Sequence, residues 1–291
     1  MLVTGKGGVG KTTVAAAIAK AFARGGKRVL CGEVSPDSAA PSAMAEALGG
    51  GVAGEEPVEV SPNIWSVLLT PSMGHRRFLQ DTLPFKLLAD AAMRSAAVRK
   101  FLMAAPGFAD MGVMYRMLDL MRRTYPDGRF EFDACVVDSP ATGHALALAQ
   151  IPEFLLKVIP KGPIGRAARE GLDLLTDPVR CGAVVVTLPE TLPVTEAQEL
   201  CVGLSLHHIP LVALVVNRVP VDPFTSEERL AVDQLLASRS AVMGSREMRR
   251  IDRAAAAIRS LGPDLPAPLT LVPEFQESNG KLTELISNVL G

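Results

Sequence analysis

The residues best suited to chemistry form a glycine-rich segment near the start of the chain, Gly5–Thr13, with the sequence GKGGVGKTT. Its glycines let backbone N–H groups close around the α- and β-phosphates of a nucleotide, and the following helix adds the positive end of its dipole. A chance glycine-rich turn is the alternative, but the strand-like residues before it and the alanine-rich helix after it favour a phosphate-binding loop. The residues predicted to contact the nucleotide are Gly7, Gly8, Val9, Gly10, Lys11, Thr12 and Thr13, with Lys11 on the β- and γ-phosphates and the Thr12 hydroxyl on Mg²⁺.

A second lysine, Lys6, stands one residue after the first glycine of this loop. It cannot easily reach the phosphates of its own loop if Lys11 already occupies that place. A cation supplied across a dimer interface could instead neutralise charge that develops at the γ-phosphate, as an arginine finger does. We therefore predict that Lys6 acts on the nucleotide of a partner subunit, with a solvated loop lysine as the alternative.

A second motif follows the apolar strand predicted at 132–137. Asp138 stands at the carboxyl end of that strand, where ligands of open α/β sheets gather, and its carboxylate could hold a Mg²⁺-bound water. The turn Ser139–His144 comes next and is rich in hydroxyl groups, with one glycine. Such a turn is suited to sense a γ-phosphate and to re-aim the helix after it.

The elements that must position these residues alternate between apolar runs and helical segments. Strands are predicted at 28–31, 63–69, 130–138, 183–187, 211–216 and 268–272. A chain that is 48% hydrophobic but only 4% aromatic has a core of small aliphatic side chains, as in a buried parallel sheet under helices. The sequence predicts an α/β fold with a doubly wound, mainly parallel sheet, as in P-loop NTPases.

The length of 291 residues, with no stretch typical of a linker, predicts one domain over 1–291 with an inserted α-helical subdomain. We place this insert at about 72–125 and 151–178, with helix interruptions at Pro152 and at 160–163. A phosphate loop that begins at residue 5 leaves little room for the strand before it. We expect either an unusually short central strand or a start placed slightly late.

Together the two motifs resemble those of the arsenite-pump and tail-anchored-protein targeting ATPases. Lys6–Thr13 is similar to the deviant Walker A loop of dimeric ATPases whose first lysine acts in trans. Thr142–His144 resembles the core of the second switch in the arsenite-pump and targeting ATPases, and partition and division ATPases lack this Thr-Gly-His core. The resemblance implies ATP and Mg²⁺ as cofactors, a homodimer or a heterodimer with a related ATPase, and a helical subdomain that moves with the nucleotide and binds a client.

Two further segments are similar to that family. Leu188–Glu196 resembles its segment after the next strand, and Asn217 follows a strand where the family has an asparagine that recognises adenine. An amide can donate and accept on the base edge. The loop that contains Pro273 would complete the adenine pocket. The alternative for Asn217 is an ordinary turn residue.

One position departs from the family pattern. Where its first switch has an aspartate that orients the attacking water, this chain has Ser35. Serine cannot serve as that general base unaided. Asp37 could substitute if the loop is re-registered, and Glu33 could act on Mg²⁺ or water. The predicted catalytic groups are Lys6, Lys11, Asp37 and Asp138, and hydrolysis could be slow, partner-dependent or lost, which would leave an ATP-binding dimerisation scaffold.

The predicted helical insert is rich in methionine. Seven of the eleven methionines lie from Met73 to Met121, and Met111, Met114 and Met121 share one helical face. Such faces adapt to varied apolar clients. An ordinary helix-on-helix core with methionine as filler is the alternative, and the second helical segment is short for a full client groove.

Composition excludes several classes of protein. The net charge of −1 gives no electrostatic reason to expect nucleic-acid binding, and the basic cluster at 246–253 is diluted by acidic residues, which favours a solvated helix face. The four cysteines contain no C-x-x-C pair, so no zinc site is expected. No apolar run approaches the length of a membrane-spanning helix and no signal segment precedes the loop, so we expect a cytoplasmic protein.

The predicted C-terminal helix, residues 282–290, carries an apolar face. It could bind membranes, as in division-site ATPases that position themselves on a membrane. Because Lys281 is the only cation beside it, lipid affinity would be weak, and packing on the sheet is favoured.

Overall fold

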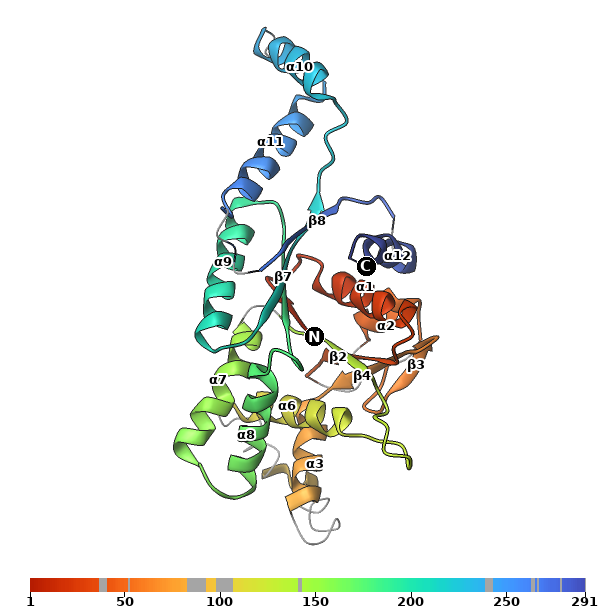
Figure 1. Cartoon of the computed structure of the whole chain (residues 1–291), viewed down its shortest axis with the longest axis vertical. Coiled ribbons are helices and arrows are strands. Elements are labelled where there is room, and N and C mark those ends of the chain that lie inside the picture. The colour runs from red at the N-terminus through yellow and green to blue at the C-terminus, as the bar shows by residue number, and fades with distance from the viewer. Residues whose placement is uncertain are drawn as a thin grey trace.

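A mainly parallel sheet forms the centre of the molecule (Figure 1). The computed structural model describes residues 1–36, 41–51, 53–82, 93–97, 107–140, 143–238, 243–262, 265, 267–277 and 279–290. Within these residues the sheet has eight strands in the order β3-β4-β2-β5-β1-β6-β7-β8. The strands are β1 Leu2–Gly5, β2 Val29–Val34, β3 Val58–Ser61, β4 Ile64–Leu69, β5 Ala134–Asp138, β6 Ala183–Thr187, β7 Leu211–Val219 and β8 Leu269–Pro273.

All neighbouring strands pair in parallel except β3, which pairs antiparallel with β4. The predicted α/β class is therefore confirmed, although the edge strand β3 was not predicted. The described helices are α1 Lys11–Arg24, α2 Ala43–Leu48, α3 Pro71–Thr82, α6 Phe108–Met121, α7 Gly143–Val158, α8 Gly162–Thr176, α9 Thr191–Leu206, α10 Ser226–Ser238, α11 Ser245–Arg259 and α12 Asn279–Leu290.

Alternate residues of the central strands face opposite helical layers, as the pleat of a strand requires. Val3, Val136 and Val184 pack in one core cluster with α1. Leu2 and Val137 face the other way and pack with residues of α6, α7 and α8. The sheet is thus covered on both faces, by α1, α2 and α12 on one side and by α6 to α9 on the other (Figure 1).

The central strand β1 is short but occupies the middle of the sheet, between β5 and β6. Its four residues are all buried. Gly5 ends the strand at the carboxyl edge of the sheet, and α1 begins six residues later at Lys11. This central position of β1 places the glycine-rich loop beside the ends of both neighbouring strands.

The helical layer beside α6 is closely packed. α3 and α6 cross at two glycines: a Cβ on Gly74 would lie 1.7 Å from the carbonyl oxygen of Gly112, so larger residues would force the helices apart. Met111 and Met114 are buried in the core, as the helix-packing alternative predicts. The interruption predicted at Pro152 is wrong, because α7 continues through this residue. The hydrogen bond that proline cannot donate is offset by burial of neighbouring leucines of α7 in the core.

The C-terminal helix α12 packs mainly on other helices. Lys20 Nζ of α1 donates to Thr283 Oγ1 at 3.0 Å, and that hydroxyl donates to the carbonyl oxygen of Ala47 in α2 at 2.9 Å. Ile286 is buried in the cluster between α1 and the sheet. The predicted packing on the sheet is therefore only partly right, because α1 and α2 provide much of the contact. In the described part of the chain, no helix is both long and apolar enough to cross a membrane.

Candidate functional site

The glycine-rich loop takes a conformation that only glycines allow. Gly5 and Gly10 have φ of 148° and 91°. A Cβ on Gly5 would lie 2.1 Å from the carbonyl oxygen of Val186 in β6, and one on Gly10 would lie 2.4 Å from Asn217 Nδ2. The loop therefore runs close against the ends of β6 and β7. Gly10 is also the N-cap of α1, so the loop leads directly into the positive end of that helix.

Thr12 and Asp138 meet at the start of α1. Thr12 Oγ1 donates to Asp138 Oδ2 at 2.5 Å. Asp138 ends β5, which pairs with β1 in the register Val3↔Asp138, so neighbouring parallel strands bring the carboxylate to the loop. Burial raises the pKa of the Asp138 carboxyl to about 6, and Glu33 adds to the rise, while the Thr12 hydrogen bond and the Lys11 charge oppose it.

The groups around Asp138 suit a Mg²⁺ ion held largely through water and phosphate. Asp138 Oδ1 is buried and accepts no hydrogen bond from the described residues, so one carboxylate oxygen is left for a ligand. Among those residues, no three His, Cys, Asp or Glu side chains cluster as they would around a metal ion held by protein ligands alone. Mg²⁺ commonly takes one or two protein ligands and completes its shell with waters and substrate phosphates.

Both lysines of the loop are engaged within the chain. Lys11 Nζ donates to the carbonyl oxygen of Lys6 at 3.0 Å. Burial lowers the pKa of Lys11 below its usual value, and the charge of Asp138 opposes this. Lys6 Nζ lies 2.7 Å from Glu196 Oε1 of α9. The sequence placed Glu196 only within a segment of family resemblance, so its contact with Lys6 was missed.

The carboxylate near the end of β2, that of Glu33, is already hydrogen-bonded within the described residues. Ser35 is buried, and its backbone N–H donates to the carbonyl oxygen of Leu69. The Glu33 carboxylate lies at the start of α2, where it accepts from Ser42 Oγ at 2.6 Å and from the backbone N–H of Met44 at 3.2 Å. Asp37 lies outside the described residues.

The second predicted switch is only partly described. Ser139 is buried directly after β5. Thr142 lies outside the described residues, and Gly143 begins α7. The backbone of His144 belongs to α7, which begins at Gly143, five residues along the chain after Asp138 ends β5.

The residues predicted to bind adenine come together in one cavity. Asn217 and Pro273 line a cavity of about 230 Å³ with Thr13 of α1. Asn217 is buried, and its Nδ2 donates to the carbonyl oxygen of Val9 at 2.9 Å. α12 supplies part of the wall through Leu282 and Ile286, a contribution that the sequence did not reveal because this helix is far from the loop along the chain.

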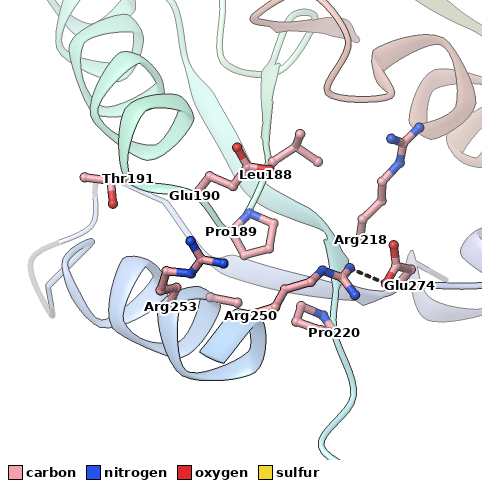
Figure 2. A pocket seen from close by; sticks show the side chains of 10 residues that line it. Leu188, Pro189, Glu190, Thr191, Arg218, Pro220, Arg250, Arg253 and Glu274 are labelled. Atoms are coloured by element: carbon pink, nitrogen blue, oxygen red, sulfur yellow. Dashed lines mark hydrogen bonds and ion pairs between the residues drawn. The ribbon is translucent and has the colours of Figure 1, made fainter. Parts of the chain in front are cut away.

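A second, larger cavity of about 490 Å³ opens at the same edge of the sheet, between the start of α9 and α11 (Figure 2). Arg218, Arg250 and Arg253 line it, and Arg250 forms an ion pair with Glu274. Arg218 and Glu274 also line the cavity that holds Asn217. The predicted solvated face of 246–253 is thus partly corrected, since Arg250 and Arg253 face a cavity next to the candidate nucleotide site.

The helical layer contains an apolar cavity of about 290 Å³, lined mainly by residues of α3, α6, α7 and α8. His75 is buried in its wall, and its Nε2 lies 2.6 Å from the carbonyl oxygen of Phe108. Burial lowers the pKa of His75, so the neutral imidazole is favoured. The larger apolar side chains of the wall are Phe78, Leu79, Phe108, Met111, Tyr115, Leu155 and Ile164.

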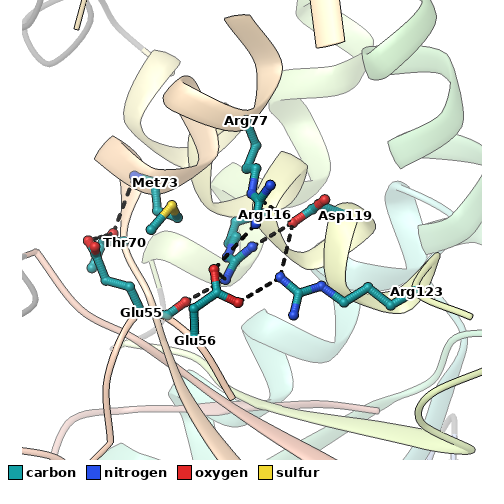
Figure 3. A network of polar contacts seen from close by, with 8 residues as sticks. All are labelled: Glu55, Glu56, Thr70, Met73, Arg77, Arg116, Asp119 and Arg123. Atoms are coloured by element: carbon teal, nitrogen blue, oxygen red, sulfur yellow. Dashed lines mark hydrogen bonds and ion pairs between the residues drawn. The ribbon is translucent and has the colours of Figure 1, made fainter. Parts of the chain in front are cut away.

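A buried arginine joins this layer to the segment before β3 (Figure 3). Arg116 of α6 is fully buried; it donates to Asp119 Oδ2 at 2.5 Å and to Glu56 Oε1 at 3.0 Å, and also to the carbonyl oxygen of Glu55. Arg123 binds the same Glu56 carboxylate at 2.8 Å. α6 is therefore fixed to the edge of the sheet by charged hydrogen bonds as well as by apolar packing.

Comparison with known proteins gives consistent matches. A family model described as anion-transporting ATPase matches residues 1–162. The ATPase BagA of Mycobacterium tuberculosis is 28% identical over 223 residues, which cover 75% of this chain and 64% of that protein. A putative arsenical pump-driving ATPase of Halobacterium salinarum is 26% identical over 255 residues, covering 80% of this chain and 38% of the relative. The ATPase GET3C of Arabidopsis thaliana is 24% identical over 263 residues, which cover 75% of this chain and 66% of that protein.

Proposed function

Because the chain belongs to the anion-transporting ATPase family, we propose that it binds ATP with Mg²⁺ at the Gly5–Thr13 loop and hydrolyses the bond between the β- and γ-phosphates. The observation that carries this proposal is the contact of Thr12 with Asp138 beside Lys11, at the carboxyl edge of the sheet. This arrangement puts a hydroxyl, a buried carboxylate and a cation within one small site. The chain matches only 64% of the length of the mycobacterial ATPase BagA. The activity of such a whole protein is therefore proposed for this chain and not taken over from the match.

In this proposal each residue has a separate task. The backbone N–H groups of Gly7 to Thr13 bind the α- and β-phosphates, and Lys11 leaves the Lys6 carbonyl to bind the β- and γ-phosphates. Thr12 and Asp138 hold Mg²⁺, Asp138 through water; the ion would neutralise charge on the phosphate oxygens. Asn217 and Pro273 hold the adenine ring, with the walls provided by α12.

We further propose that two protomers close on their nucleotides and that Lys6 acts on the nucleotide of its partner. The partner would be a second copy or a related ATPase, and the assembly would work in the cytoplasm. This arrangement is supported by the place of Lys6, because Lys11 is the lysine proposed to bind the phosphates of its own loop. A second cation is more useful to a triphosphate when it comes from across an interface.

The proposed output is movement of a helical subdomain, about 72–125 and 151–178, within a single domain over 1–291. The order of residues along the chain supports this coupling, because the predicted switch Ser139–His144 lies between Asp138 at the end of β5 and the body of α7. The apolar cavity between α3 and α6 is the proposed binding site for an apolar part of a protein client. Its wall is almost entirely apolar, which suits an aliphatic or aromatic side chain.

A nucleotide-dependent scaffold with little hydrolysis is the second candidate function. Two observations favour it. Ser35 replaces the expected aspartate, and the Glu33 carboxylate is hydrogen-bonded at the start of α2 and so is not free to act on water. Asp37 would then be the remaining acidic candidate in this segment.

Steady-state hydrolysis of Mg-ATP separates the two functions. An ATPase should turn over in the wild type and lose most of its activity in Lys6→Ala and Asp37→Ala, while nucleotide binding persists, because these residues would act on the transition state. An inactive wild type that gains turnover on Ser35→Asp would favour the scaffold. Failure of the wild type to bind ATP at all would contradict both.

A further inference from the structure

The ion pair between Lys6 and Glu196 keeps the proposed trans-acting lysine on its own chain. Lys6 Nζ lies 2.7 Å from Glu196 Oε1, and the two side chains are 39% and 31% exposed. The pair joins the loop after β1 to the second turn of α9, which begins four residues after β6 ends. Because β1 and β6 are neighbours in the sheet, with Gly5 in register with Val186, the fold itself sets this distance.

The Glu196 carboxylate is only half satisfied by this contact. Its second oxygen, Oε2, is buried and receives no hydrogen bond from any described residue. A carboxylate in this state depends on its single cationic partner, since an unpaired buried charge is costly. Lys6 is therefore held by a group that has little other compensation within the described part of the chain.

We propose that Glu196 is the resting partner of Lys6: it holds the ammonium in cis until the nucleotide of a second protomer replaces it. The inference rests on the proposed dimeric function and deepens it by naming the contact that must break. Glu196 thus acts through Lys6 as a positioning residue and has no direct contact with the reacting atoms.

The strength of the pair suits a reversible role. A partly exposed ion pair changes an equilibrium by about fivefold at most. A triphosphate carries several charges and offers more acceptor oxygens than one carboxylate, so it should displace Glu196 once a protomer approaches with bound nucleotide. In a homodimer two such pairs must break. The factors by which the two pairs change the dimerisation equilibrium constant then multiply.

The first test measures the contact in the nucleotide-free full-length protein. Lys6 is acylated with a small amine-reactive ester at fixed pH, and the rate is followed by mass spectrometry of the peptide that contains it. We expect Glu196→Gln to speed labelling of Lys6 by about twofold to fivefold, because the carboxylate no longer occupies the ammonium. Glu199→Gln is the control, since it makes the same change at an exposed residue of α9. In this variant Lys6 should be labelled at the same rate as in the wild type.

The second test measures assembly by sedimentation with Mg²⁺ and a non-hydrolysable ATP analogue. In Glu196→Gln, half of the protein should be dimeric at a total concentration about fourfold to twenty-fivefold lower than in the wild type, because two pairs, each with an effect of about twofold to fivefold, no longer oppose closure. In a Lys6→Ala background the same substitution should have no such effect, since the residues act as a coupled pair.

The outcomes separate this inference from the proposed function. Equal labelling of Lys6 in the wild type and Glu196→Gln would overturn the resting contact whether or not the protein dimerises. Faster labelling with an unchanged dimerisation midpoint would show an ion pair without a holding role and would also overturn it. If neither protein dimerises with the analogue, the dimeric function itself fails, and the holding role fails with it.

Discussion

At the scale of single residues, the candidate site contains a buried carboxylate, that of Asp138, whose charge is not fully compensated in the absence of a ligand. The Asp138 carboxylate is buried with one oxygen unpaired, and its pKa is raised to about 6. Burial of a carboxylate favours its neutral form, so keeping Asp138 charged at neutral pH costs stability. A cation bound nearby would remove that cost, which is a reason to expect such a site to be less stable when empty.

This cost predicts the behaviour of Asp138→Asn in the nucleotide-free protein with a metal chelator. Because the folded pKa lies above the unfolded value, the native state binds the proton more tightly, and the free energy of unfolding falls as pH rises from about 4 to about 6. The amide avoids this penalty, so the variant should be about 1–3 kcal/mol more stable than the wild type at pH 7.5, with the difference closing towards pH 4. Urea denaturation of both proteins at several pH values measures this difference in the free energy of unfolding.

Asp133→Asn is the matched control with the opposite sign. Hydrogen bonds from Arg28 lower the pKa of Asp133 to about 2, so its charged form stabilises the fold. That stability is present above the unfolded pKa and is lost as pH falls towards about 2. A less stable Asp138→Asn at pH 7.5 would contradict our account of the empty site.

At the scale of elements, the sheet holds the loop and the α6 network fixes the helical layer. Arg116→Ala should lower the free energy of unfolding by about 2–4 kcal/mol, because Asp119 and the Glu55 carbonyl would lose a buried donor. Arg77→Ala, which removes a partly exposed member of the same network, should cost less than about 1 kcal/mol. Denaturant titration of both variants gives the comparison, and equal losses would show that burial of Arg116 does not matter.

The sequence could predict those elements whose signals are local. The glycine spacing located the loop, and the apolar runs located the parallel strands, because a buried strand carries its own pattern. Strand β3 was missed because its four residues are exposed or only partly buried, so it lacks the unbroken apolar run of the central strands. Pro152 was misjudged because burial around α7 outweighs one lost hydrogen bond. The Lys6–Glu196 pair and the α12 wall join residues far apart in sequence, and no local pattern encodes such contacts.

At the scale of the whole molecule, the carboxyl edge of the sheet gathers the features that the proposed dimer would use. The loop, Asp138, the Asn217 cavity and the arginine-lined cavity all lie along this edge. α10 and α11 extend from the body beyond the end of β7 (Figure 1). A partner that closes over the nucleotides would meet this whole edge.

If Lys6 acts across a dimer, two inactive variants that each keep a different half of the site should restore activity when they are mixed. Lys6→Ala keeps its own Asp138 and can accept a lysine from a partner, whereas Asp138→Asn supplies Lys6 but has a defective site of its own. Alone, each should hydrolyse little Mg-ATP. An equimolar mixture should recover about a quarter of wild-type turnover, because half of randomly formed dimers contain one complete site. Activity no higher than the mean of the two separate variants would contradict the account.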